Sequence, residues 1–216
     1  MIKVNNISVM NFDNAIRGMR NPLNSWEKSD SSFLPLYAPP HEYVAEIGEN
    51  DLALAMRLAN AGSDDRKFLR QILVSVDITA PLYWWKEFDT YKVGTVANSC
   101  STMHRIHSKE VTLEDFSWEH LDEPGIQLLE ATIDYLNHNR KLFNLTKDKR
   151  YWHNMIQILP TSYNQLRTVT LNYEVLRNMY HARKHHKLDE WHSLCDAIEQ
   201  MPYSQLIIGG RDERGE

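Results

Sequence analysis

Cysteine is scarce in this chain, whose 216 residues include only Cys100 and Cys195. The two lie far apart, without a Cys-x-x-Cys or Cys/His zinc spacing, so neither a disulfide framework nor a structural zinc site is expected. Long apolar runs are absent, and the first residues lack the basic flank and apolar stretch of a secretory signal. The sequence therefore predicts a cytoplasmic protein with no membrane partner.

An excess of basic residues is also missing. Lys and Arg number 24 against 29 Asp and Glu, which gives a formal net charge of −5. Such a chain has no global field that attracts DNA or an anionic membrane, so we expect no nucleic-acid partner, and an anionic ligand needs a local basic pocket. Hydrophobic residues at 42% and charged residues at 25% are typical of a globular protein, and the length favours a single domain over 1–216.

Hydrophobic periodicity predicts a mixed α/β (α+β) fold without the regular alternation of a doubly wound sheet. Alternating and β-branched residues indicate strands at 2–4, 43–47, 73–79 and 166–171. Apolar residues at three- and four-residue spacing indicate helices from about residue 50, from about residue 64, and at 82–88, 123–139, 151–159, 173–186 and 189–200. The segment 11–42 is rich in turn residues and is predicted to be a loop or lid, and 209–216 a frayed tail.

The densest polar and aromatic stretch runs from residue 84 to residue 104. Small hydroxyl residues gather after Gly94, where side-chain and backbone donors suit phosphate oxygens, and Lys92 supplies a positive charge. The alternative is an ordinary polar loop with an N-capping serine. Cys100 is a candidate nucleophile in the same stretch, although spacing assigns it no histidine partner.

A second group of candidate residues lies between 172 and 187. On the predicted helix, Arg183 projects from a different face than the apolar stripe, and its planar guanidinium suits paired hydrogen bonds to a base carbonyl or a phosphate. The alternative is a solvated basic face at a helix C-terminus. His181, His185 and His192 allow a metal site to be imagined, but a Glu after the first His and a clear third ligand are missing, so no metal is predicted.

The order of several sequence blocks resembles the flavin-dependent thymidylate synthases. Residues 158–173 are similar to the family's Leu-Pro segment, which leads into a strand ending in Asn, here Asn172. Arg183 follows eleven residues later, at the family's spacing. Residues 76–82 are similar to the strand and Ala-Pro turn before the family's signature helix, and 189–191 resemble the start of its closing helix.

The signature motif of that family is altered here. Where the family has Arg-His-Arg, seven residues and then Ser-x-Arg, an ungapped count gives Thr-Tyr-Lys at 90–92 and Cys-Ser-Thr at 100–102. Only Lys92 keeps its charge, and each lost charge-assisted hydrogen bond removes about 1.5–3 kcal/mol. Residues whose position could compensate are His104, Arg105, Lys109 and Arg20.

The resemblance implies an enzyme that methylates dUMP to dTMP. It implies FAD as the cofactor that carries the chemistry, methylenetetrahydrofolate and NADPH as co-substrates, and a homotetramer with sites built from several subunits. Arg183 is then the residue that contacts the pyrimidine and polarises it. The other substrate-binding residues are then Ser101, Cys100, Asn98 and Lys92, and the cofactor-binding residues are Lys92, Tyr91, Asn172 and Asn178.

Three alternatives stay open from the sequence. Trp84, Trp85, Tyr91 and Tyr163 are candidate walls of the implied pocket, or equally core residues. The altered signature also fits flavin- and folate-dependent modification of another pyrimidine nucleotide. It fits as well a non-catalytic nucleotide-binding protein on the same scaffold.

Overall fold

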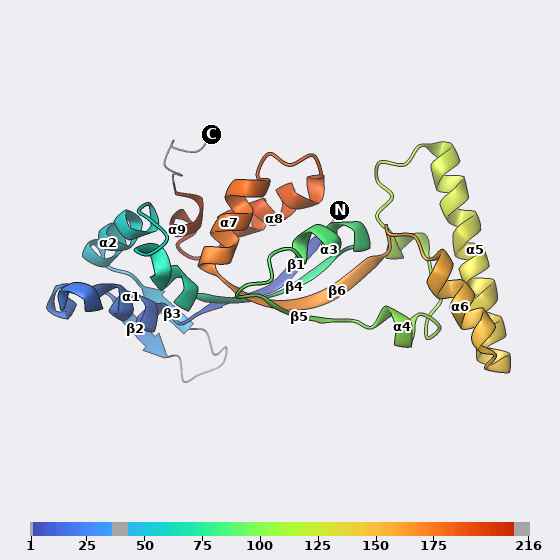
Figure 1. Ribbon diagram of the computed structural model, residues 1–216, viewed down its shortest axis with the longest axis horizontal. Helices are drawn as coiled ribbons and strands as arrows, with labels where there is room; N and C mark the ends of the chain where they lie inside the picture. The colour runs from blue at the N-terminus through green and yellow to red at the C-terminus, as the bar shows by residue number, and fades with distance from the viewer. Residues whose placement is uncertain (1, 36–42, 210–216) are drawn as a thin grey trace. The chain divides into compact units, whose positions relative to one another are not determined.

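The computed structural model describes residues 2–35 and 43–209, whose contacts cluster in two compact units (Figure 1). The first unit holds residues 2–3, 77–90 and 97–168, and the second holds 4–35, 43–76, 91–96 and 169–209. Part of the predicted loop, at 36–42, and the predicted tail at 210–216 lie outside the described residues. Within residues 2–35 and 43–209, no helix combines the length and apolar character needed to cross a membrane.

Helices and strands are mixed along the chain, which confirms the α/β (α+β) prediction. The larger sheet has the strand order β1-β4-β6-β5, with bounds Lys3–Met10, Leu73–Pro81, Asn164–Asn172 and Val96–Ser99. A two-stranded antiparallel sheet pairs β2 (Ser32–Pro35) with β3 (Tyr43–Glu46). The strands predicted at 73–79 and 166–171 are confirmed as parts of β4 and β6, whereas β1 continues well past the predicted 2–4.

The aromatic helix that follows β4 belongs to the core of the first unit. Pro81 precedes α3 (Leu82–Phe88), which has the predicted bounds. Trp84, Trp85 and Phe88 are buried and pack on one another, with ring centroids 4.9–5.1 Å apart. Trp84 and Trp85 are therefore core residues, not the walls of a pocket.

A helical hairpin forms the other part of the first unit (Figure 1). Helix α5 (Glu123–Thr146) begins where the Asp122 side chain accepts a hydrogen bond from the Gly125 N–H, and it is followed by Lys147 in the left-handed conformation. It packs along α6 (Lys149–Ile158), with Leu136 and Met155 in their shared core. The predicted helices at 123–139 and 151–159 are confirmed, and α5 continues to Thr146.

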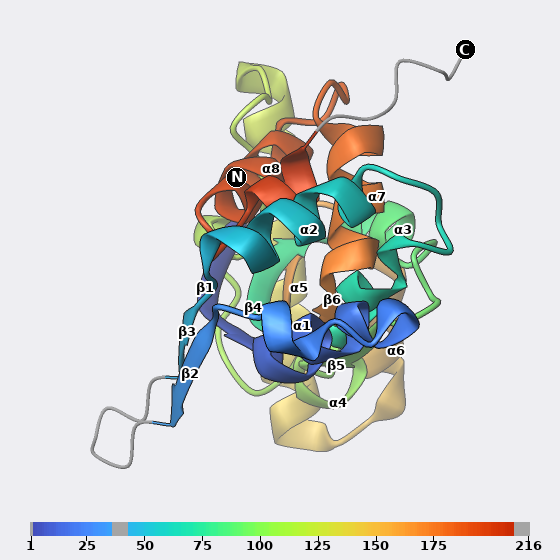
Figure 2. The ribbon, with the colours of Figure 1, turned by 90° about the vertical axis from the view of Figure 1, so that its left-hand side faces the viewer.

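Short helices α4 (Thr102–Arg105) and η4 (Leu113–Asp115) complete the first unit, and the second unit is mainly helical (Figure 2). Its helical elements are α1 (Phe12–Arg20), η1 (Asn21–Leu23), η2 (Trp26–Lys28), α2 (Glu49–Ala59), η3 (Arg66–Gln71), α7 (Tyr173–Arg183), α8 (Asp189–Glu199) and α9 (Gln205–Ile208). Helix α7 packs against α8, α9 and η3, and buries Tyr173 and Trp191 completely. The predictions at 173–186 and 189–200 are confirmed within a few residues of their ends.

Two predicted helices in this unit start or fold differently. Helix α2 begins after Gly48 rather than at Asn50, because the Asp30 carboxylate accepts hydrogen bonds from the Asn50 and Asp51 N–H groups. The helix expected from about residue 64 is the short 3-10 helix η3, because β4 begins two residues after it and leaves no room for an α-helix.

Helix α1 and strand β2 lie inside the segment 11–42, so the prediction of a loop there is wrong over Phe12–Arg20 and over Ser32–Pro35. The apolar residues of α1, Phe12, Ala15, Ile16 and Met19, have helical spacing and are buried. The flanking asparagines, which read as turn residues, end the strand and begin the helix, and Asn11 is in the left-handed conformation at φ 74°.

A buried ion pair organises the residues after α1. The Arg20 Nε donates to Asp51 Oδ1 at 2.5 Å, and both side chains are buried. The other oxygen of Asp51 accepts from the hydroxyls of Ser29 and Ser31, at 2.7 and 2.6 Å, and from two backbone N–H groups. Arg20 also donates to the backbone carbonyls of Ser25 and Lys28. The pair therefore fixes residues 25–31 to α1 and α2.

Candidate functional site

Arg183 is held by two aromatic side chains in the second unit. It is the last residue of α7, and its Nε donates to the Tyr91 hydroxyl at 3.0 Å. The guanidinium carbon lies 4.8 Å from the ring centre of Trp191 in α8 and 5.7 Å from that of Tyr91. Contact with aromatic faces and a bonded Nε restrict the rotamers of a long side chain. Arg183 is thus oriented by residues from two other segments of the chain.

The segment that carries Tyr91 lies against the start of α7. Gly94 has φ 76°, and a Cβ there would be 2.9 Å from Asn172 Nδ2 and 3.4 Å from Val175. The Asn172 Oδ1 accepts from the Val175 N–H at 3.0 Å and caps the helix. Lys92 and Asn178 are exposed. Tyr91 and Asn172 therefore have structural partners, and their assignment to a cofactor stays a prediction.

Gly94→Ala is expected to lower the free energy of unfolding by about 1–2 kcal/mol. Left-handed backbone is unfavourable for alanine by about that amount, and the added Cβ meets Asn172. Urea unfolding followed by circular dichroism measures the change. Gly62→Ala is the matched control, because the nearest side-chain atom to its Cβ is 3.7 Å away and its φ is not positive. Equal stabilities of the two variants would contradict the strained turn.

Tyr91→Phe is expected to destabilise the protein by about 1 kcal/mol, because it removes the hydroxyl that accepts from a charged guanidinium in a half-buried position. The control is Tyr135→Phe on α5, whose hydroxyl makes no hydrogen bond within the described residues. Both variants are measured by urea unfolding. An equally large loss of stability in Tyr135→Phe would show that the hydrogen bond of the Tyr91 hydroxyl does not stabilise the protein.

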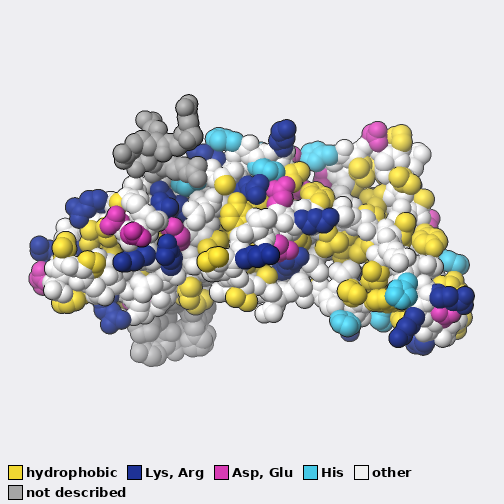
Figure 3. Space-filling model, viewed as in Figure 1, with side chains coloured by type: hydrophobic (Ala, Val, Ile, Leu, Met, Phe, Trp, Pro, Cys, Tyr) yellow, Lys and Arg dark blue, Asp and Glu magenta, His cyan; other side chains and the backbone are white. Residues whose placement is uncertain are grey.

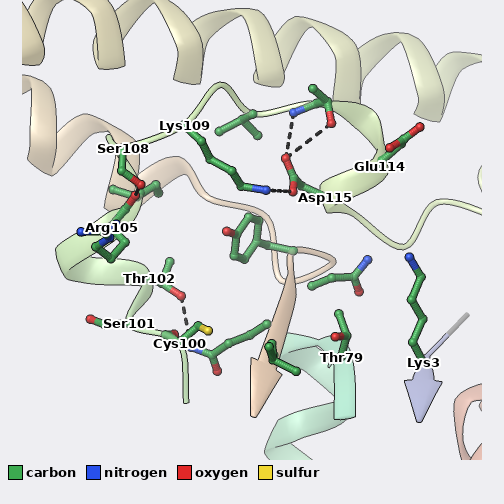
Figure 4. Close-up of a pocket in the computed structure, with 17 residues that line it drawn as sticks. Lys3, Thr79, Cys100, Ser101, Thr102, Arg105, Ser108, Lys109, Glu114 and Asp115 are labelled. Atoms are coloured by element: carbon green, nitrogen blue, oxygen red, sulfur yellow. Dashed lines mark hydrogen bonds and ion pairs between the residues drawn. The ribbon is translucent and has the colours of Figure 1, made fainter. Parts of the chain in front are cut away.

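Three of the candidate residues, Asn98, Cys100 and Ser101, lie in or directly after β5 in the first unit, and the last two line a cavity of about 500 Å³ (Figure 4). Cys100 and Ser101 are on its wall, with Lys3 and Thr79 from β1 and β4. Asn98 is exposed on β5 but does not line the cavity. Other polar residues around the cavity are Thr102, Arg105, Ser108, Lys109, Thr112, Glu114, Asp115, Tyr163, Asn164 and Gln165.

Hydrogen bonds fix the wall of the cavity where β5 passes into α4. The Ser101 hydroxyl accepts from the His104 N–H at 3.2 Å, so Ser101 is the N-capping serine of the alternative interpretation. The Gln165 side chain donates to the Cys100 carbonyl at 2.9 Å and to the Thr102 hydroxyl at 3.1 Å. Ser101 therefore caps α4 and also lines the cavity.

The positive charges of the cavity are only partly neutralised. Lys109 Nζ lies 2.5 Å from Asp115, and this hydrogen bond raises the pKa of Lys109. Burial, and then the carboxylate of Asp115, raises the pKa of Tyr163. At neutral pH the cavity therefore presents an ammonium ion and an un-ionised phenol. Within the described residues, no carboxylate pairs with the side chains of Arg105 or Lys3.

The residues suggested as compensation for the altered signature divide into two groups. Arg105 and Lys109 line the cavity with Cys100, whereas Arg20 is buried and donates to Asp51, so it cannot replace a ligand-binding arginine. His104 lies outside this cavity. The sequence did not predict Lys3 and Gln165 as lining residues of the cavity, because only strand pairing brings them to residues 100–115.

No metal centre emerges from the described part of the chain, where no group of three or more His, Cys, Asp or Glu side chains could hold an ion. His192 lies 3.6 Å from Asp189 within α8. Cys195 is buried, and burial raises its thiol pKa to about 11, which leaves it un-ionised at neutral pH. Cys100 is exposed, and none of the described residues that line its cavity is a histidine.

Comparison with known proteins adds to this geometry. Neither a family model nor a curated protein matches the chain. Among solved structures, the flavin-dependent thymidylate synthase ThyX from Helicobacter pylori, complexed with FAD and dUMP, matches with a TM-score of 0.68 at 17% identity, over 97% of this chain and 100% of that chain. The chain has the fold of a flavin-dependent thymidylate synthase. The resemblance of the sequence blocks is therefore confirmed at the level of the fold.

Two further structures carry the same fold. A second ThyX structure from Helicobacter pylori with FAD and dUMP has a TM-score of 0.67 at 18% identity, covering 96% of this chain and 98% of that chain. The UMP/dUMP methylase PolB from Streptomyces cacaoi, bound with 5-Br dUMP, has a TM-score of 0.55 at 12% identity, covering 92% of this chain and 88% of that chain. All three similar structures are described as enzymes acting on, or bound to, a uridine nucleotide.

Proposed function

We propose that this protein is a flavin-dependent enzyme that methylates dUMP to dTMP, with methylenetetrahydrofolate as the carbon donor and NADPH as the reductant. The observation that carries the proposal is the oriented Arg183, eleven residues after Asn172, in a chain that follows the thymidylate synthase fold over almost its whole length. The fold supplies the setting, and the guanidinium supplies a group suited to a uracil carbonyl.

In this proposal Arg183 binds and polarises the pyrimidine. Its rotamer is preset by Tyr91 and Trp191, so little side-chain entropy is lost when the nucleotide binds. A guanidinium that meets the carbonyl in fixed geometry also stabilises negative charge that develops on the uracil oxygen. Separately, in the first unit, we propose that Ser101, Arg105 and Lys109 bind an anionic group.

The flavin assignment is supported by fewer charged groups than the family signature provides. The exposed ammonium of Lys92 is suited to one phosphate of FAD, and the exposed amide of Asn178 to polar atoms of the cofactor. Bound flavin would supply the hydride for reductive methylation. Tyr91 supports this region by accepting a hydrogen bond from Arg183, and Asn172 supports it by capping α7. We further propose a homotetramer, which light scattering of the purified protein tests.

A second function is favoured by the altered signature together with the likeness to a UMP/dUMP methylase. In this alternative the chain modifies another pyrimidine nucleotide with the same cofactors, and UMP is the first to test. Replacement of the signature arginines by Thr-Tyr-Lys and Cys-Ser-Thr changes the groups that recognise phosphate and sugar. The non-catalytic alternative predicts a nucleotide-binding protein that takes up no flavin.

Three measurements separate these functions. Absorbance near the flavin band, before and after reconstitution with FAD, tests the cofactor. Tritium release from C5-labelled dUMP and from C5-labelled UMP, with NADPH and methylenetetrahydrofolate, then tests the reaction and the substrate. Release from dUMP, together with growth of a thymidine-requiring host, supports thymidylate synthesis. Release from UMP alone supports the second function, and a colourless protein that cannot be reconstituted contradicts both enzymes.

A further inference from the structure

Basic side chains concentrate at one end of the helical hairpin in the first unit. Residues 140–150, here called the basic tip, span the end of α5 and the start of α6. They contain Arg140, Lys141, Lys147, Lys149 and Arg150 against the single acidic residue Asp148. The whole chain carries a formal net charge of −5, so the residues outside the basic tip together carry a larger negative charge than the whole chain does. Figure 3 shows Lys, Arg and His side chains gathered over this end of the hairpin.

The charges of the basic tip are mostly unpaired. Asp148 accepts from its neighbour Arg150 at 2.7 Å, which neutralises that pair locally. In the part of the chain that the structure describes, no carboxylate pairs with Lys141, Lys147 or Lys149, and all three are exposed. Several cations at a surface without acidic partners create a local positive potential that attracts polyanions, whatever the net charge of the molecule.

An apolar cavity of about 440 Å³ is lined by Lys149 of the basic tip. Met103, Phe143 and Trp152 form its apolar wall, and Lys149, His104 and His153 contribute cationic or titratable groups. The wall is braced, because Trp152 Nε1 donates to the Met103 carbonyl at 2.8 Å, which ties α6 to α4. The His107 ring packs against Phe143 with centroids 4.9 Å apart and supports it from the side.

We propose that the basic tip and its cavity bind single-stranded nucleic acid. An aromatic wall offers a stacking surface to one unpaired base, while Lys149 at the cavity and the other exposed lysines of the basic tip meet successive phosphates. A paired duplex does not present a base face to such a cavity, so an unpaired strand is the fitting occupant. A free nucleotide has the same base and phosphate chemistry, but it would use only one of the cationic positions.

This inference does not rest on the proposed function. It departs from the expectation, based on net charge, of no nucleic-acid partner, because net charge averages over surfaces of opposite sign. Neither Arg183 nor any other residue assigned above to the nucleotide or the flavin lines the cavity, which His104, named only as a possible replacement for a signature arginine, does line. Loss of methylation activity would therefore leave the binding of a strand unaffected, and loss of strand binding would leave the proposed reaction standing.

Fluorescence anisotropy with a fluorescein-labelled twelve-nucleotide oligo-dT, in the presence of saturating dUMP, tests the proposal on the full chain. We expect binding that weakens with salt at a log–log slope of about −2, as three phosphate contacts to a single strand give. The double variant Lys147→Glu/Lys149→Glu is expected to weaken binding at least about tenfold. The control Lys67→Glu/Lys86→Glu makes the same charge change at exposed positions outside the tip and is expected to stay within about twofold.

Several results would overturn the proposal. One is an oligonucleotide that does not bind, and another is equal loss in the tip variant and the control variant. A third is binding of oligo-dT that is detected only when dUMP is left out, which would assign the cavity to a free nucleotide. Equal affinity for a labelled duplex would exclude recognition of an unpaired base. Circular dichroism of both double variants checks that the comparison is made on folded protein.

Discussion

Asp51→Ala is expected to destabilise the protein by about 3–5 kcal/mol, because removing one partner of a buried ion pair leaves the other charge uncompensated. The Arg20 guanidinium is 4% exposed, and Asp51 is completely buried. Deleting the carboxylate also removes the acceptor for two serine hydroxyls and two backbone N–H groups. Urea unfolding, monitored by circular dichroism, measures the loss.

Asp64→Ala is the matched control for this prediction. Asp64 is exposed just before η3, and its removal is expected to change the free energy of unfolding by less than about 0.5 kcal/mol. Asp51→Asn separates charge from shape, because the amide keeps one acceptor but cannot neutralise Arg20. If Asp51→Ala is less stable than wild type by under about 1 kcal/mol, the cluster is not a buried ion pair in solution.

The same carboxylate gives a pH dependence with a defined sign. Burial alone would raise the pKa of Asp51, but hydrogen bonds from Ser31, Ser29 and Arg20 outweigh it and hold the pKa below its ordinary value of 3.8. A depressed pKa contributes stability above the unfolded-state value, and this contribution is lost as the pH falls through the folded-state value. Wild type is therefore expected to lose more stability below about pH 4 than Asp51→Asn does.

Arg183→Ala is expected to weaken dUMP binding by about 1–3 kcal/mol if the guanidinium meets the pyrimidine. Isothermal titration calorimetry measures the change. Arg183→Lys is expected to recover only part of the affinity, because an ammonium ion can neither form the paired hydrogen bonds nor stack between Tyr91 and Trp191 in the same way. The prediction is thus about geometry as well as charge.

Lys184→Ala is the control for the arginine variants, since Lys184 is exposed and follows Arg183 directly. Its removal changes the net charge by the same amount and is expected to leave dUMP affinity within about twofold. Unchanged affinity in Arg183→Ala would remove this residue from the site. Equal weakening by both variants would assign the effect to the general positive potential around the end of α7.

Local signals in the sequence predicted most of the elements. Pro81 and the aromatic run after it predicted α3, and the spacing of Leu129, Ile133 and Leu136 predicted α5. Helix α1 was missed because asparagines on both sides suggested turns, although its apolar residues have helical spacing. Tertiary packing decides such short helices more than propensity does.

The candidate site shows where sequence reasoning stops. The spacing after Asn172 predicted Arg183 as a site residue. Its aromatic partners Tyr91 and Trp191, which lie 92 and 8 residues away in the sequence, were not predicted. Similarly, the approach of Lys3 and Gln165 to residues 100–115 depends on strand pairing. Long-range partners of this kind leave no periodic trace in the sequence.

The carboxylates at positions 30 and 51 have a kinetic consequence for residues 25–31. Asp30 caps the N-terminus of α2, and Asp51 holds two serines of the same stretch. Moving this stretch away from the protein would therefore remove the cap of α2. It would also leave the buried Arg20 guanidinium without its partner. Gating of ligand entry by these residues is accordingly disfavoured, and stopped-flow association with a nucleotide is expected to show no slow opening phase that originates here.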